Sequence, residues 1–104
     1  MIPHENLIKT KEYWLLHIQN DMHAILDDYM QDYNLTLKQA AEALNINQNE
    51  LQKIHDGEFD GNIEEMIDFS LKVDKLPDVN FKTESQYFNE LKEWYNELQN
   101  KRNT

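Results

Sequence analysis

Residues 36–57 carry the pattern that most constrains how this chain can fold. They read Thr-Leu-Lys-Gln-Ala-Ala-Glu-Ala-Leu-Asn-Ile-Asn-Gln-Asn-Glu-Leu-Gln-Lys-Ile-His-Asp-Gly. Two helices can cross closely only where a small residue lies between them, and Ala41 meets that requirement. Asn45, four residues later, tolerates the left-handed backbone of a tight turn. The segment therefore predicts two short helices joined by a tight turn, with one small core formed by Leu44, Ile46, Leu51 and Ile54.

Polar capping pairs predict where four helices begin. In each pair a Thr or Asn is followed three residues later by Gln or Glu, whose side chain can reach back to the first backbone N–H. The pairs are Thr36 with Gln39, Asn47 with Glu50, Asn62 with Glu65, and Thr83 with Gln86. Gly57 is typical of a left-handed helix end. With only two glycines and two prolines in 104 residues, the chain is expected to be all-helical.

Apolar spacing predicts the remaining helices of the compact domain. A long helix over about residues 11–33 would present one apolar face, formed by Trp14, Ile18, Met22, Ile25, Tyr29 and Tyr33. A later helix over about residues 63–73 is expected to point Ile63, Met66, Ile67 and Leu71 inward. Phe59, in the loop between Gly57 and Asn62, is expected to anchor that loop to the core.

The C-terminal segment has an apolar seam of its own. Four residues recur at steps of four and three, which is the spacing of a short coiled-coil seam: Tyr87, Leu91, Trp94 and Leu98. The seam would either fold back on the first helix or meet a second copy of the chain, and the sequence leaves both open. We therefore expect a loose arm over residues 1–9, a compact domain over 10–82, and an amphipathic helix over 83–104 that is a candidate dimer contact.

The segment 36–57 resembles the helix-turn-helix of the XRE family, which includes Cro and the phage repressors. The likeness extends to Glu-Tyr-Trp-Leu-Leu-His before the motif, and after it to Asp-Gly-Glu-Phe-Asp-Gly-Asn and the later Lys-Val-Asp-Lys-Leu-Pro-Asp-Val-Asn-Phe. Together these segments cover about residues 10–82. It implies an all-α, five-helix, lambda-repressor-like domain with the tail as an additional C-terminal amphipathic helix. Leu37 departs from the family pattern, which commonly has a phosphate-binding Gln there, and Asn45 replaces the usual turn glycine.

The resemblance implies a sequence-specific DNA-binding transcriptional regulator, a repressor, that inserts its third helix in the major groove as a dimer on an inverted repeat. The implied base-reading residues are Asn47, Gln48, Asn49, Gln52 and Lys53, and the implied phosphate contacts are Thr36 and Lys38. Asn and Gln side chains suit this role because they can bond bidentately to N6 and N7 of adenine.

Charge favours a second interpretation. Twenty acidic residues against ten basic ones give a net charge of −10, and residues 35–73 hold eight carboxylates and three lysines, a net of −5. Such a chain repels polyanions at long range, and we expect its carboxylates to lie mostly away from the third helix. The alternative is an acidic protein-binding module on a helix-turn-helix scaffold, antitoxin-like or DNA-mimicking, with a basic protein partner at Asp27, Asp28, Asp32, Glu58, Asp60, Glu64, Glu65 and Asp68. A further interpretation is that these acidic residues only form solvent-exposed helix faces and bind no partner.

The sequence offers no motif for catalysis or a cofactor. Cysteine is absent, which excludes disulfides and thiolate ligands. His17 and Asp21 lie one helical turn apart, but two ligands do not make a zinc site. Glycine-rich phosphate loops and nucleophile motifs are missing, and so are a membrane-spanning apolar run and a signal-peptide pattern. We expect a cytoplasmic non-enzyme that binds double-stranded DNA as a homodimer, without cofactor, metal or membrane.

Overall fold

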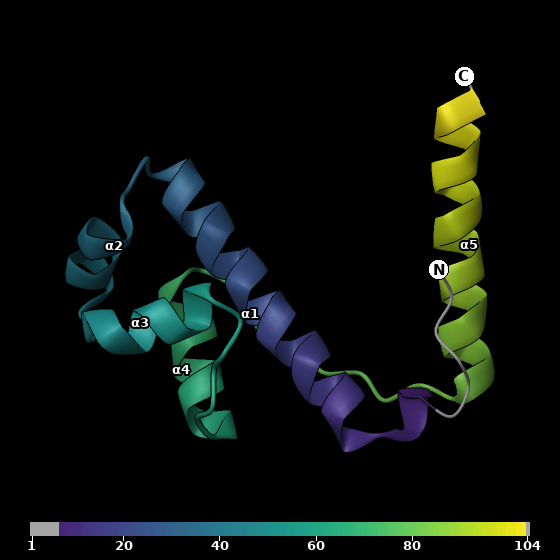
Figure 1. Cartoon of the computed structure of the whole chain (residues 1–104), viewed down its shortest axis with the longest axis horizontal. Helices are drawn as coiled ribbons and strands as arrows, with labels where there is room; N and C mark the ends of the chain where they lie inside the picture. The colour runs from purple at the N-terminus through teal and green to yellow at the C-terminus, as the bar shows by residue number, and fades with distance from the viewer. Residues whose placement is uncertain (1–6, 104) are drawn as a thin grey trace. The chain divides into compact units, whose positions relative to one another are not determined.

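The computed structural model describes residues 7–103, and within them it is all-helical, as predicted (Figure 1). A short 3-10 helix, η1, covers Leu7–Lys9, and five α-helices follow. Their bounds are Lys11–Asp32 for α1, Leu37–Leu44 for α2, Gln48–His55 for α3, Ile63–Lys72 for α4 and Glu84–Asn103 for α5. The expected N-terminal arm falls mostly on residues 1–6, outside the described part, while Ile8 in η1 is buried.

The chain divides into two compact units, and each is described by itself. The first, Lys9–Pro77, contains α1 to α4, and the second contains α5. The first unit ends at Pro77, five residues before the boundary expected at residue 82. It holds all the residues expected to read bases or contact phosphate, so the candidate site belongs to one unit.

Each of the helices α1 to α4 is followed, within two residues of its end, by a residue in the left-handed conformation, although the chain has few glycines. These residues are Asn34 (φ 53°), Asn45 (φ 54°), Gly57 (φ 74°) and Asp74 (φ 63°). The next residue then returns its N–H to a carbonyl five positions back, as Ile46 does to Ala41 at 3.0 Å. The predictions for Asn45 and Gly57 are confirmed. Asn and Asp supply the other two turns because their short polar side chains tolerate positive φ.

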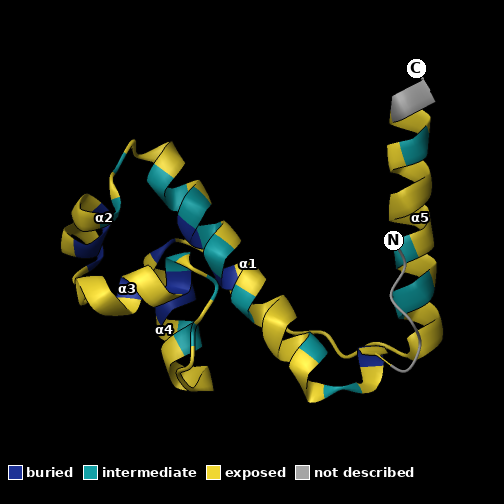
Figure 2. Ribbon diagram, in the orientation of Figure 1, coloured by how far each residue is buried: buried dark blue, intermediate teal, exposed yellow. Residues whose placement is uncertain are grey.

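The core lies where α2, α3 and α4 meet the C-terminal half of α1 (Figure 2). Its buried side chains are Met22, Leu26, Ala40, Ala41, Leu44, Leu51, Ile54, Phe69 and Val73. Ala41 is buried, as a close helix crossing requires, and the partly buried Ile46 and Phe59 pack against the cluster. The small core predicted from residues 36–57 and the anchoring role of Phe59 are therefore confirmed.

The apolar face predicted along α1 is buried over only part of its length. Met22 and Leu26 are buried, but Trp14, Ile18 and Tyr33 are exposed. The reason is length: α1 has 22 residues and is about 33 Å long, whereas α2, α3 and α4 have 8 to 10 residues and are about 12 to 15 Å long. The short helices cover only part of the long one within this unit.

The inward face predicted for α4 is also partly wrong. Ile63 and Leu71 are 65% and 50% exposed, while Phe69 and Val73 are each only 3% exposed. Met66 and Ile67 are half-buried. The buried face of α4 is therefore formed by Met66, Phe69 and Val73. Their spacing of three and four residues is as helical as that of the residues predicted to point inward.

The second unit contains α5, a helix of 20 residues. Its start is the predicted capping box: the Thr83 N–H donates to Gln86 Oε1 at 3.0 Å, and the Gln86 N–H donates to Thr83 Oγ1 at 3.2 Å. Along the predicted seam Tyr87 and Leu91 are half-buried, and Trp94 and Leu98 are 56% and 40% exposed. α5 thus presents large apolar side chains at its surface.

Candidate nucleic-acid interface

The N-terminus of α2 places both expected phosphate contacts at the surface. The Thr36 N–H donates to Gln39 Oε1 at 2.8 Å, and the Gln39 N–H donates to Thr36 Oγ1 at 3.2 Å, so the predicted capping box is complete. Thr36 and Lys38 are both exposed. The cap fixes the Thr36 hydroxyl, whereas Lys38 is the only cation on α2.

Asn47 is primarily the cap of α3. Its Oδ1 accepts the backbone N–H of Asn49 at 2.8 Å and that of Glu50 at 3.3 Å. A capping oxygen shared by two donors is poorly available as a base acceptor. Asn47 therefore stabilises the start of α3. Among its side-chain groups, mainly the NH₂ group is left to bond another partner.

Gln48, Asn49 and Gln52 form one exposed row on α3. They lie on the side opposite Leu51 and Ile54, which anchor the helix in the core. The Gln52 side chain donates from Nε2 to Asp56 Oδ1 at 3.0 Å, one turn further along. The row thus offers two amides, Gln48 and Asn49, at the first turn and a third amide next to a carboxylate.

Lys53 is paired with a carboxylate. Its Nζ lies 3.3 Å from Asp60 Oδ2, and the lysine side chain is 54% exposed. Asp60 and Asp56 are therefore exceptions to the expectation that the carboxylates lie mostly away from the third helix. The C-terminal half of α3 carries its own counter-charges, because the loop after Gly57 passes beside it.

Two contacts between α1 and the α3 region were missed by the sequence analysis. His23 donates from Nδ1 to the backbone carbonyl of His55 at the end of α3, and the two imidazole rings lie 5.4 Å apart. Gln19 donates from Nε2 to the carbonyl of Phe59 at 2.8 Å. Both bonds satisfy carbonyls at or just after the helix end, and together they fix the end of α3 and its loop to α1.

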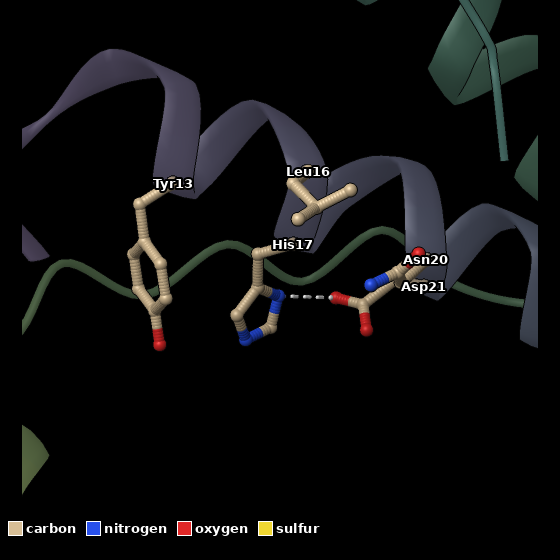
Figure 3. A pocket seen from close by; sticks show the side chains of 5 residues that line it. All are labelled: Tyr13, Leu16, His17, Asn20 and Asp21. Atoms are coloured by element: carbon tan, nitrogen blue, oxygen red, sulfur yellow. Dashed lines mark hydrogen bonds and ion pairs between the residues drawn. The ribbon is translucent and has the colours of Figure 1, made fainter. Parts of the chain in front are cut away.

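The exposed half of α1 holds a shallow hollow of about 250 Å³, lined by Tyr13, Leu16, His17, Asn20 and Asp21 (Figure 3). All five side chains come from this one helix, and His17 Nδ1 lies 3.1 Å from Asp21 Oδ2, as their spacing predicts. The described residues contain no group of three or more His, Asp or Glu side chains that could hold a metal ion. The hollow brings together no third ligand or nucleophile.

Comparison of the chain with protein-family models, with curated proteins and with solved structures found no match. Among residues 7–103, no helix is long and apolar enough to cross a membrane.

Proposed function

We propose that this protein is a sequence-specific DNA-binding transcriptional regulator with a lambda-repressor-like helix-turn-helix, in which α3 enters the major groove. The observation that carries the proposal is the exposed row of Gln48, Asn49 and Gln52 on a helix whose opposite side is anchored by Leu51 and Ile54. Side chains on a rigidly held helix can read base edges without first ordering their backbone.

The chemistry of the row favours adenine as the contacted base. Asn and Gln can each donate to N7 and accept from N6 of adenine, and a good bidentate pair is worth about 1 to 3 kcal/mol of discrimination. Gln48 and Asn49 are the leading readers, because Asn47 caps the helix and Lys53 is paired with Asp60. Lys38 and the start of α2 supply the phosphate contact.

The charge distribution requires that affinity come from more than phosphate attraction. Each neutralised phosphate contributes about −0.9 to the slope of log affinity against log salt, and α2 and α3 together offer only Lys38 and Lys53. A two-fold dimer would double the contacts and place two copies of α3 about 34 to 36 Å apart, one turn of DNA. The exposed Trp94 and Leu98 of α5 support a dimer contact through the C-terminal helix.

Selection from a pool of random duplexes, performed with the full chain at low and moderate salt, tests the proposal. We expect enrichment of a short inverted repeat containing A·T pairs and loss of that enrichment in the Gln48→Ala, Asn49→Ala double variant. The matched control is Gln31→Ala with Asn89→Ala, which removes one glutamine and one asparagine that are exposed on other helices. If the pool remains random at low salt, the regulator proposal fails.

A further inference from the structure

A hollow of about 380 Å³ lies between α3, α4 and the loop that joins them. Its apolar lining comes from four side chains that also contact the core: Ile46, Ile54, Phe59 and Phe69. Its charged lining comprises four carboxylates and two lysines: Glu50, Asp60, Glu65, Asp68, Lys53 and Lys72. The hollow thus has an apolar floor and a charged rim. It lies on a different side of α3 from the row formed by Gln48, Asn49 and Gln52.

The third residues of α3 and α4, Glu50 and Glu65, both line this hollow. At Thr36 and Thr83 the third-position glutamine returns its side chain to the cap N–H. At Asn47 and Asn62 the cap accepts from the backbone N–H of Glu50 and Glu65, and among the described residues no return bond from either glutamate is found. Both glutamate side chains instead line the hollow, where their carboxylates are available to an external donor.

Two contacts hold the walls of the hollow in place. Gln19 holds the Phe59 carbonyl at 2.8 Å, which fixes the loop to α1. A Cβ added at Gly61 would meet the Glu65 carboxylate and the Phe59 ring, so these two side chains close over the glycine. A ligand would therefore meet a largely preorganised surface, which lowers the entropy cost of binding.

The net charge of the residues that line the hollow favours a cationic ligand. Four carboxylates and two lysines give the lining a net charge of −2, and Asp60 already pairs with Lys53. Glu50, Glu65 and Asp68 have no ion-pair partner among the described residues. Arginine can satisfy such carboxylates bidentately, while a nucleic acid would be repelled from them.

We propose that this hollow docks a basic, amphipathic segment of another protein, with one apolar side chain against the half-buried Ile46 and Phe59 and arginine or lysine side chains on Glu50, Glu65 and Asp68. Docking by an apolar anchor surrounded by charged contacts is a common form of peptide recognition. The inference goes beyond the proposed DNA reading, because it uses the side of α3 that faces α4.

A phage-displayed library of random short peptides, selected on the immobilised full chain, tests the docking site. We expect the retained peptides to combine arginine or lysine with a Leu, Met or aromatic residue. Binding of the most enriched peptide, followed by fluorescence anisotropy, should weaken about tenfold in the Glu65→Gln, Asp68→Asn double variant, because each exposed ion pair lost is worth about two- to fivefold.

Asp28→Asn with Asp32→Asn is the matched control, since it removes the same two charges from the exposed surface of α1. It should weaken binding less than about twofold, because separated surface charges are screened by salt. Equal weakening in both variants would show that the peptide is held only by long-range electrostatic attraction, and it would overturn the proposed docking site. Failure to enrich cationic peptides, or equal binding after the apolar residue of the peptide is changed to Ser, would overturn it as well. None of these outcomes depends on whether α3 binds DNA.

Discussion

At the scale of single residues, the turn between α2 and α3 depends on Asn45. Its φ of 54° and ψ of 48° place it in the left-handed region, which costs an ordinary side chain about 1 to 2 kcal/mol. We expect Asn45→Ala to lower the free energy of unfolding by about 1 kcal/mol, whereas Asn45→Gly should leave it unchanged or slightly higher. Urea unfolding followed by circular dichroism measures both. Equal losses in the two variants would indicate that the asparagine side chain, and not the backbone conformation, stabilises the turn.

The buried face of α4 can be tested with one pair of substitutions. Phe69 is 3% exposed and Leu71 is 50% exposed. Phe69→Ala should therefore cost about 3 to 5 kcal/mol through the cavity it leaves, while Leu71→Ala should change stability by less than about 1 kcal/mol. Thermal or urea unfolding of the two variants distinguishes the faces. A larger loss of stability for Leu71→Ala than for Phe69→Ala would show that the face of α4 expected from the sequence is the buried one.

Local features were predicted well at this scale, and contacts between distant residues were not. Asn45, Gly57 and the N-terminal caps depend on neighbours within about four residues, so the sequence pattern contains their cause. The Lys53–Asp60 pair depends on the path of a seven-residue loop, and the His23 bond joins residues 32 positions apart. The α4 face was misassigned because two apolar spacings of three and four coexist in one short helix.

At the scale of the element, the surface of α3 is divided into two sides. Gln48, Asn49 and Gln52 lie on its exposed side, whereas Glu50 and Lys53 line the hollow toward α4. Two different ligands can therefore use different sides of the same helix, and Lys53 is the one residue of α3 that both proposals involve. α1 is the support common to both sides, because His23 holds the end of α3 and Gln19 holds the following loop.

The Lys53–Asp60 pair gives a prediction specific to α3. Asp60→Asn should strengthen DNA binding several-fold at low salt, because it removes a negative charge and frees Lys53 for a phosphate. If Lys53 then contacts one phosphate per subunit, the salt slope should become steeper by about 0.9 per subunit. Titration of a labelled duplex at several salt concentrations measures both quantities.

Glu64→Gln provides the control, because Glu64 is an exposed acid on α4 that does not line the hollow. It removes the same charge but leaves Lys53 paired with Asp60. An equal gain in the two variants would show that net charge alone, rather than release of Lys53, governs affinity.

At the scale of the whole molecule, the DNA proposal needs two copies of the chain. Light scattering should give a mass of about 25 kDa for the full chain, twice the 12.5 kDa of one copy. Trp94→Glu with Leu98→Glu should shift the mass to that of a single chain, because charges are poorly tolerated in an apolar seam. Glu93→Gln with Glu97→Gln on the same helix is the control that leaves the seam intact. A single-chain mass for the unchanged protein would exclude a dimer through α5.

The central claim, that the start of α3 and the start of α2 form the DNA-binding face, can be tested by following the backbone amide resonances of the isotopically labelled full chain. A mixed-sequence duplex is added at low salt, where non-specific binding is strongest. We expect chemical-shift changes concentrated at residues 36–38 and 47–53, which disappear as salt is raised. Absence of shifts at the lowest salt, or shifts confined to α4 and α5, would contradict the central claim.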